Sequence, residues 1–332
     1  MQQLTFSDGS VLLRATEEDE GLRGFVHAVP LFPGVFLMFI DIASSTWPNI
    51  DLALSEPDTA RERNAYLLNY AVSGSCKVIL DNNSFVLQKQ EDLSLSSHFA
   101  KDDYFYPEGH YQGLEFFVAP VAANRSAGAS SGAPMQYWFG LDFASLFRKY
   151  ELRGKTKLGT CPGVLRTSFS DLWMLYPFGE EPAPFSTETL AAMRTETLRI
   201  FQHLQFDRSP FTGARRPVFR TPQLRVTEEA AALVREDLQK DWTLDALSET
   251  LGVSDSSLKR YFQNIYGCSV AAFQRKARME RAAELLRSPD TRAMSVLDVA
   301  LDVGYENQSK FAAAFKRTFG ESPLEFKKNA IL

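Results

Sequence analysis

Basic and polar residues recur at helical spacings in two segments of the last third of the chain. They are Ser256, Lys259, Arg260 and Gln263 in the first segment, and Gln308, Ser309, Lys310, Lys316 and Arg317 in the second. Lysine and arginine side chains donate hydrogen bonds to phosphate oxygens and to base edges, and an arginine–guanine pair discriminates between bases by about 1–3 kcal/mol. The chemistry that these residues predict is therefore non-covalent recognition of double-stranded DNA.

The charge is unevenly distributed along the sequence. The net charge of −5 alone argues against a nucleic-acid ligand, but residues 225–332 are balanced, with 16 basic and 16 acidic residues. Between positions 256 and 281, six basic residues, among them Arg275 and Lys276, are accompanied by only one acid, Glu280. We expect Arg275, Lys276, Lys316 and Arg317 to contact phosphates, which positions a protein on DNA without specifying a sequence. The alternative is a solvated helix face.

An internal repeat occupies the C-terminal third. The segment LSETLGVSDSSLKRYFQNIYGCSVAAF (247–273) corresponds to VALDVGYENQSKFAAAFKRTFGESPLEF (299–326), with Gly252 and Gly304 at an offset of 52. Both segments read as helix, glycine turn and second helix, and Ser254 has the residue type of an N-cap. A helix-turn-helix places its second helix in the DNA major groove. One copy would fit an ordinary helical hairpin equally well, but two copies with matching glycines favour DNA binding.

The segment between the repeats, about 270–287, predicts one long amphipathic helix. Its apolar residues, such as Val270, Phe273 and Leu285, can pack against both repeats. Such a helix would hold the two reading helices at a fixed separation. A separation of about 34 Å, one turn of B-DNA, would let one chain read two successive major grooves.

The two repeats and the helix between them resemble the DNA-binding domain of the AraC/XylS family of transcription regulators. The resemblance covers about residues 224–328, and its strongest part is DVALDVGYENQSKFAAAFKRTFGESPLEFKK (298–328). It implies contacts with bases or phosphates by Ser256, Lys259, Arg260, Gln308, Ser309, Lys310 and Ala313. The family often has a larger polar residue where this chain has Ala313, so we expect the second unit to position more than to specify. The resemblance also implies a homodimer and a contact with RNA polymerase.

The first 120 residues predict β-structure. Short apolar or alternating runs occur at 34–43, 65–74, 76–81, 84–89, 92–97 and 113–120, and turn signals such as Ser73-Gly74-Ser75 separate several of them. Closely spaced short strands favour a barrel or jelly roll, and the part around 65–120 resembles the cupin-like sensor domain of AraC-type regulators. The predicted fold class is α+β and multidomain: a β-barrel or jelly roll, the helices that follow it, and an all-α double helix-turn-helix.

The sequence divides into four parts. Residues 1–160 are expected to form the β-rich sensing domain, and 161–205 a helical segment. Amphipathic stretches at 165–176 and 186–205 either pair two subunits or pack back onto the barrel. Residues 206–222 contain three prolines and four arginines and predict a linker that could also contact DNA phosphates. Residues 223–332 form the predicted DNA-binding domain.

Aromatic residues are concentrated at 102–117, DDYFYPEGHYQGLEFF. A barrel interior can hold a small effector, and such sites are lined mainly by apolar and aromatic side chains. The candidate effector-binding residues are Tyr70, Tyr104, Tyr106, His110 and Tyr111. The alternative is that these rings fill the hydrophobic core. Nothing in the sequence selects a class of effector.

No residue pattern predicts an enzyme, a metal site or a cofactor. The four histidines are scattered, and the three cysteines fit no metal spacing or disulfide framework, which favours a reducing cytoplasm. GASSG (128–132) matches the G-x-S-x-G pattern of a nucleophile elbow but lacks the required preceding strand and following helix. The N-terminus does not read as a signal peptide, and no apolar run approaches the roughly 18–20 residues of a membrane span. We therefore expect a cytoplasmic protein that does not contact a membrane.

Together these patterns predict a sequence-specific DNA-binding transcription regulator that is controlled by a small-molecule effector in its N-terminal domain. The first alternative is an AraC-type regulator without an effector, controlled by its abundance or by a protein partner. An enzyme with a DNA-binding appendage, and an architectural protein that binds DNA without sequence preference, are two further alternatives.

Overall fold

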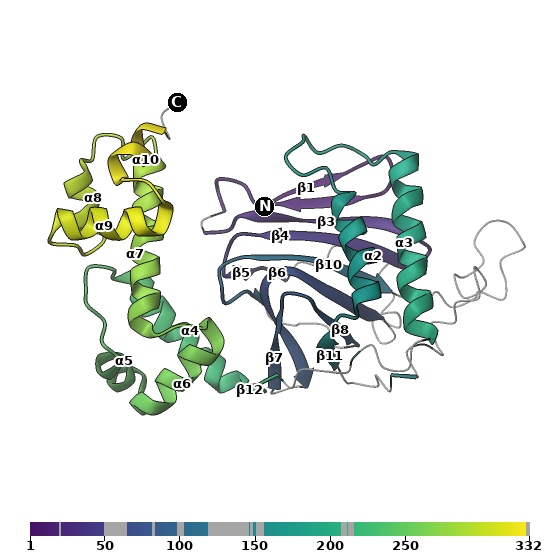
Figure 1. Cartoon of the computed structure of the whole chain (residues 1–332), viewed down its shortest axis with the longest axis horizontal. Coiled ribbons are helices and arrows are strands. Elements are labelled where there is room, and N and C mark those ends of the chain that lie inside the picture. Colours follow the sequence, from purple (N-terminus) through teal and green to yellow (C-terminus); the bar gives the residue numbers. More distant parts are fainter. Residues whose placement is uncertain are drawn as a thin grey trace, which may run out of the picture. The chain divides into compact units, whose positions relative to one another are not determined.

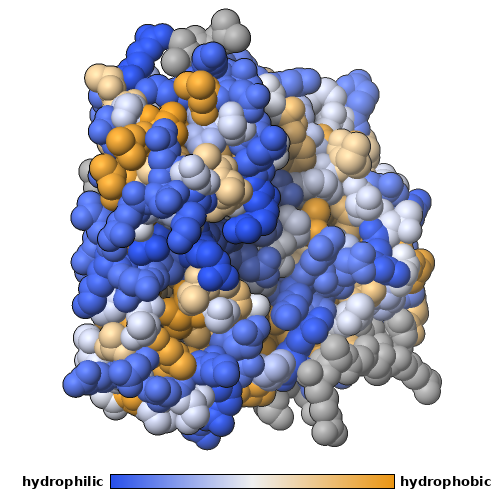
Figure 2. Space-filling model, turned by 60° about the vertical axis from the view of Figure 1, so that its left-hand side comes forward, coloured by the Kyte–Doolittle hydropathy of each residue, from blue (hydrophilic) through white to orange (hydrophobic). Residues whose placement is uncertain are grey.

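The computed structural model describes residues 1–19, 21–49, 65–81, 84–97, 103–118, 146, 149–150, 156–206, 211 and 216–329. The chain divides into two compact units, Met1–Phe219 and Arg220–Leu332. Hydrophilic residues cover most of the face shown in Figure 2, where apolar residues form separate patches, as is normal for a folded protein surface. Within the described ranges, no helix combines the length and the apolar character that a membrane span requires.

The N-terminal unit is built on an antiparallel sheet (Figure 1). Its strands follow the order β1–β2–β3–β4–β10–β6–β7, and β8 pairs with both β6 and β11. The strands are β1 (Gln2–Thr5), β2 (Val11–Arg14), β3 (Gly24–Phe32), β4 (Val35–Ile42), β6 (Tyr66–Asp81), β7 (Ser84–Lys89), β8 (Asp92–Ser96), β10 (Tyr111–Val118) and β11 (Thr156–Thr160). Two short strands, β5 (Thr46–Trp47) and β9 (Tyr104–Phe105), pair with each other. The sheet confirms the predicted β-rich N-terminal part.

Strand β6 is one strand of 16 residues where the sequence predicted two. Its first part, up to Gly74, pairs with β10, and its second part, from Ser75, pairs with β7. Gly74 has a φ of 73°, and a Cβ added to it would lie 2.3 Å from the carbonyl oxygen of His110. The glycine therefore allows a close approach of two backbones at the point where the strand changes partner. The predicted strand break at Ser73-Gly74-Ser75 was wrong.

Helices α2 (Gly163–Met174) and α3 (Thr187–Phe206) cover one face of this sheet (Figure 1). Their residues Phe169 and Phe201 belong to the same hydrophobic cluster as Phe39 and Phe116 of the strands, and the rings of Phe116 and Phe201 lie 5.3 Å apart. Complete burial of such a side chain stabilises the fold by about 1.5–3 kcal/mol. The helices predicted at 165–176 and 186–205 therefore form and pack onto the sheet of their own chain. Their pairing of two subunits stays a prediction.

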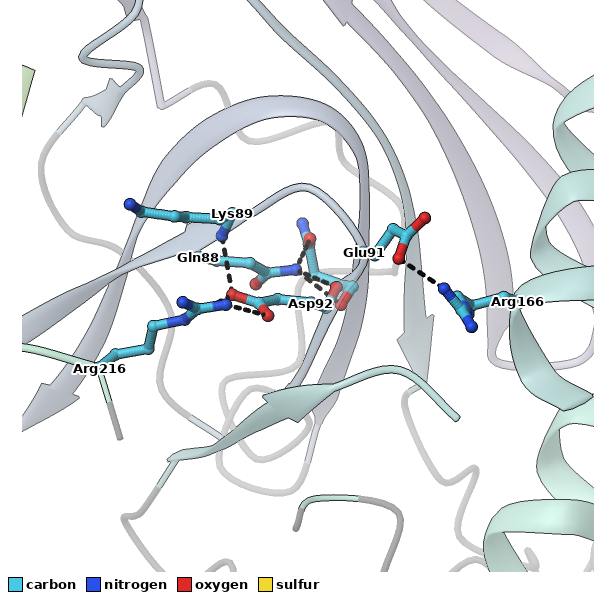
Figure 3. A network of polar contacts seen from close by, with 7 residues as sticks. Gln88, Lys89, Glu91, Asp92, Arg166 and Arg216 are labelled. Carbon is cyan, nitrogen blue, oxygen red and sulfur yellow. Dashed lines mark hydrogen bonds and ion pairs between the residues drawn. The ribbon is translucent and has the colours of Figure 1, made fainter. Parts of the chain in front are cut away.

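A buried ion pair holds the last residues of the N-terminal unit (Figure 3). The side chain of Asp92 is 1% exposed. It accepts hydrogen bonds from Arg216 Nη2 at 2.7 Å and Nε at 3.0 Å, and from the backbone N–H of Lys89 at 2.9 Å. The sequence placed Arg216 in a linker whose arginines could contact DNA phosphates. This guanidinium instead binds a carboxylate in a bidentate, charge-assisted pair, and three residues later the ring of Phe219 lies 5.4 Å from that of Phe85.

The C-terminal unit is helical. Its helices are α4 (Thr221–Glu236), α5 (Leu244–Leu251), α6 (Asp255–Tyr266), α7 (Val270–Arg287), α8 (Val296–Asp302), α9 (Gln308–Phe319) and α10 (Pro323–Asn329), and the two-residue β12 (Phe219–Arg220) precedes them. Helix α7 contacts α4, α6 of the first repeat, and α8 and α9 of the second repeat. The predicted long helix at 270–287 is confirmed, and it forms the shared core of both repeats.

Candidate functional site

The first repeat forms a helix-turn-helix from α5 and α6. Gly252 ends α5 in the left-handed conformation, with a φ of 66°. Ser254 caps α6, because its side chain accepts a hydrogen bond from the backbone N–H of Ser257 at 3.3 Å. Ser248 of α5 also donates a hydrogen bond to Asp255 at the start of α6. The predicted glycine turn and serine cap are therefore both confirmed.

Helix α6 buries one face and exposes the other. Leu258, Phe262 and Ile265 are buried. The predicted reading residues Ser256, Lys259, Arg260 and Gln263 are all exposed. Gln263 donates to the carbonyl oxygen of Gly267 at 2.8 Å, so its amide satisfies the C-terminal end of its own helix. Ser256, Lys259 and Arg260 are thus the better placed of these side chains for an external partner.

The second repeat forms a matching pair from α8 and α9. The N-cap of its reading helix α9 is Asn307, whose side chain accepts from the backbone N–H of Lys310 at 3.0 Å. The predicted contact residues Gln308, Ser309, Lys310, Lys316 and Arg317 are all exposed. In the alanine triplet, Ala314 is buried in the core while Ala313 is exposed. The exposed face of α9 therefore carries basic side chains near both ends and the small side chain of Ala313 in the middle.

Arg275 and Lys276 lie on the exposed face of α7. Lys276 Nζ lies 3.6 Å from Glu280 Oε1, and both side chains are more than half exposed. Such a surface pair contributes about 0–1 kcal/mol. A phosphate could replace Glu280 as the partner of Lys276 at little energetic cost.

The loop between α4 and α5 contacts both α7 and the turn of the second repeat. Arg278 donates from Nε to the carbonyl oxygen of Leu238 at 2.8 Å and from Nη2 to that of Lys240 at 3.2 Å. Leu238 and Lys240 belong to the turn between α4 and α5. A Cβ added to Gly304, at the turn of the second repeat, would lie 2.5 Å from the same Leu238 oxygen. This contact brings the turn of the second repeat directly against the loop between α4 and α5.

Comparison with known proteins points to the same part of the chain. A family model described as a helix-turn-helix domain matches residues 247–329. The probable transcription factor PqrA of Proteus vulgaris is 34% identical over 89 residues, which cover 27% of this chain and 70% of PqrA. The chain belongs to the AraC/XylS family of transcription regulators. This membership places it among regulators and not among enzymes.

Two further matches each cover about three tenths of this chain. The transcriptional regulator MtrA of Neisseria gonorrhoeae is 35% identical over 91 residues, which cover 27% of this chain and 29% of MtrA. The C-terminal domain of AraT, a response regulator from Geobacillus stearothermophilus, is a solved structure with 32% identity, a TM-score of 0.29, and coverage of 31% of this chain and 84% of that one. Although the chain spans 70% of PqrA, it spans about a third of MtrA.

The N-terminal unit of this AraC/XylS-family chain contains a cavity of about 110 Å³. The cavity lies on the sheet face away from α2 and α3, where Val26, Met38 and Ile40 belong to a second hydrophobic cluster. Its lining also includes Trp47 of β5 and Tyr104 of β9, so the small two-stranded sheet forms part of its wall. The volume is below the roughly 300–1,000 Å³ of a drug-sized ligand pocket.

The predicted effector-binding residues divide between two places. Tyr104, Tyr106 and Tyr111 line the cavity, and the rings of Tyr106 and Tyr111 stack at 5.1 Å. Tyr70 lies on the opposite face of the sheet, because its ring stacks on Phe169 of α2 at 4.4 Å. His110 is exposed and is not part of the lining. The structure therefore does not place Tyr70 or His110 at this cavity.

The sequence missed the polar residues of the cavity. Glu115, in β10, is 8% exposed and accepts a hydrogen bond from Asn69 Nδ2 at 2.9 Å. Asn69 Oδ1 in turn accepts from Tyr111 at 2.6 Å and from Gln88 Nε2 at 2.9 Å. Both residues interrupt apolar runs, LLNYAV (67–72) and GLEFFV (113–118), and that interruption is the signal that could have identified them. Among the described residues, no group of three or more histidine, cysteine, aspartate or glutamate side chains could hold a metal ion.

Burial raises the pKa of Glu115 from 4.5 to about 7. The unfolded chain therefore ionises this group at lower pH than the folded chain does, so the contribution of Glu115 to stability is full below pH 4.5 and is lost as the pH rises through about 7. We expect Glu115→Gln, which cannot ionise, to gain about 2 kcal/mol relative to wild type between pH 5 and pH 8. Urea unfolding of both proteins at the two pH values measures this difference, and an unchanged difference would contradict the assignment.

Proposed function

We propose that the chain is a sequence-specific DNA-binding transcription regulator that inserts α6 and α9 into successive major grooves and responds to a small molecule in its N-terminal unit. The observation that carries this proposal is the pair of helix-turn-helix units on one shared helix, each with an exposed polar face on its second helix. A second helix presented in this way is the element that reads base edges.

The two reading helices are proposed to have different tasks. On α6, Lys259 and Arg260 are exposed and long enough to reach base edges, and they are therefore proposed to specify the sequence. On α9, the exposed Ala313 offers no hydrogen bond, and Lys316 and Arg317 are proposed to bind phosphates. Arg275 and Lys276 of α7 add further phosphate contacts in this proposal.

Two alanine variants separate these tasks. We expect Arg260→Ala to relax sequence preference and to weaken binding to the target site by about 1–3 kcal/mol, with little effect on other DNA. We expect Lys316→Ala to weaken binding to all sequences about equally and to reduce the slope of log K against log salt by about 1. Fluorescence anisotropy with target and scrambled duplexes over a salt series measures both effects.

A charge-matched control for these variants lies in the other unit. Lys89→Ala removes an exposed charge from β7 and is expected to leave both the affinity and the salt slope unchanged. If Arg260→Ala and Lys316→Ala weakened target and scrambled DNA alike, the proposed division between specifying and positioning residues would be wrong.

We further propose that the chain is a cytoplasmic regulator that binds a small-molecule effector, forms a homodimer and contacts RNA polymerase. The cavity, with its aromatic walls and buried acid, supports the effector, whereas its small volume favours the alternative of a regulator controlled by abundance or by a protein partner. Thermal shift and promoter-DNA binding across a broad metabolite panel distinguish the two. A compound that changes both properties would support effector control, and the absence of any such compound would favour the alternative.

A further inference from the structure

Glu115 of β10 is a buried acid at the wall of the cavity. It is 8% exposed, it lines the cavity, and among the described residues only Asn69 donates a hydrogen bond to it, to its Oε2 at 2.9 Å. Taking a carboxylate out of water without a compensating charge is costly, and in proteins such groups are normally paired. The Glu115 carboxyl therefore retains hydrogen-bonding capacity at the cavity.

The other ionisable groups around Glu115 do not supply a positive charge to it. Cys76, Tyr104, Tyr106 and Tyr111 lie near enough to be affected by the charge of Glu115, and burial raises the pKa of each, so they are neutral at physiological pH. Lys77 also belongs to the lining. Among the described residues, no ion pair joins Lys77 to Glu115, whose pKa is raised by burial and lowered by the Asn69 hydrogen bond.

The walls of the cavity suit a cation as well. Its lining includes Trp47, Tyr104, Phe105, Tyr106 and Tyr111. An ammonium group near the faces of such rings is attracted by the ring quadrupoles, most strongly when water is excluded. An acid at one wall and aromatic rings at the others are the features by which proteins recognise small organic ammonium ions.

We propose that the cavity binds a small organic monocation, an alkylammonium with a short apolar body, whose charged nitrogen pairs with Glu115. This inference rests on the proposed function, since it names the chemical class of the effector. The volume of about 110 Å³ restricts the ligand to a few heavy atoms. A free anion of the same size would meet the carboxylate and is excluded by like-charge repulsion.

Binding of a cation is coupled to ionisation of Glu115. Because the pKa of Glu115 is about 7, roughly a tenth of the carboxyls are ionised at pH 6 and roughly nine tenths at pH 8. An alkylammonium ion remains charged at both pH values. Its dissociation constant is therefore expected to fall about tenfold from pH 6 to pH 8.

A set of three probes of nearly equal size tests the proposal. Propylammonium, 1-propanol and propionate differ mainly in charge, and each is titrated at constant ionic strength into the full chain while thermal unfolding is followed. We expect propylammonium alone to raise the melting temperature of the wild type, with the larger rise at pH 8. We expect Glu115→Gln, which keeps an oxygen to accept from Asn69, to abolish the rise. Glu108→Gln, the same substitution at an exposed position, is expected to retain it.

Each contrary outcome has a distinct meaning. Equal shifts with 1-propanol or propionate would overturn the cation class while leaving the cavity as a binding site, so effector control would stand. A shift that survives in Glu115→Gln, or that is independent of pH in the wild type, would overturn the role of Glu115. No shift with any probe would overturn the inference, whereas effector control itself would still be decided by the metabolite panel.

Discussion

Replacing Arg216 with alanine is expected to lower the free energy of unfolding of the N-terminal unit by about 3 kcal/mol. Among the described residues, the change leaves the carboxylate of Asp92, which is 1% exposed, with only the backbone N–H of Lys89 as a partner. Removing one member of a buried ion pair costs about 3–5 kcal/mol, because the remaining charge stays out of water. Arg216 itself is 24% exposed, which places the expected loss at the lower end. Urea unfolding of the full chain, followed by tryptophan fluorescence, measures it.

Two further variants distinguish this mechanism from simple loss of a surface charge. Arg166 makes a single 2.6 Å contact with Glu91, and both side chains are nearly half exposed (Figure 3). Arg166→Ala is therefore expected to cost less than about 1 kcal/mol. Adding Asp92→Asn to Arg216→Ala should recover part of the loss, since the unpaired charge is then gone. If Arg216→Ala and Arg166→Ala lowered the free energy of unfolding equally, the buried ion pair would contribute no more to stability than the exposed one.

Gly304→Ala is expected to destabilise the C-terminal unit by about 2–5 kcal/mol. The residue has a φ of 79°, a conformation that costs an alanine about 1–2 kcal/mol. The new Cβ would also lie 2.5 Å from the Leu238 oxygen and 2.9 Å from the Gln239 Cα, and the backbone displacement that relieves such overlap costs about 1–3 kcal/mol more. Because the displaced loop is the one held by Arg278, the orientation of α6 relative to α9 should change as well.

Gly252→Ala is the matched control for this substitution. Gly252 occupies the corresponding turn of the first repeat with a φ of 66°, but nothing lies within 4 Å of its added Cβ. It should therefore show only the conformational cost of about 1–2 kcal/mol. Thermal or urea unfolding, with DNA affinity measured in parallel, compares the two variants. If the Gly304→Ala protein were no less stable than the Gly252→Ala protein, the close contact between Gly304 and Leu238 would contribute nothing to stability, contrary to this account.

The C-terminal unit could be predicted well because its signals are local. Gly252, Ser254 and the phenylalanines of the repeat each specify a turn, a cap or a buried position within a few residues of themselves. The N-cap of α9 is less clear from the sequence, since Glu306 and Asn307 are both plausible at a helix N-terminus and the hydrogen bond to Lys310 distinguishes them. The contact between Gly304 and Leu238 joins two distant segments and leaves no local trace.

The N-terminal unit was harder to predict because both faces of its sheet are apolar. In β6, Leu68 and Tyr70 pack in the cluster that α2 and α3 cover, while Leu67 and Asn69 line the cavity. A strand buried on both faces shows no alternation of apolar and polar residues, so the sequence does not tell which face Tyr70 occupies. Ser73-Gly74-Ser75 reads as a turn because serine and glycine are typical turn residues, although Gly74 lies within the continuous strand β6.

The most direct measurement of the central claim is the selection of DNA sites from a random duplex library by the full-length protein. Two reading helices on one rigid unit predict a bipartite motif, with half-sites one helical turn, about 10–10.5 bp, apart. The half-site read by α6 should carry more sequence information, and Arg260→Ala should remove it while the other half-site persists. Recovery of sequences without a shared motif, or of a motif that Arg260→Ala leaves intact, would contradict recognition of DNA by the α6 face.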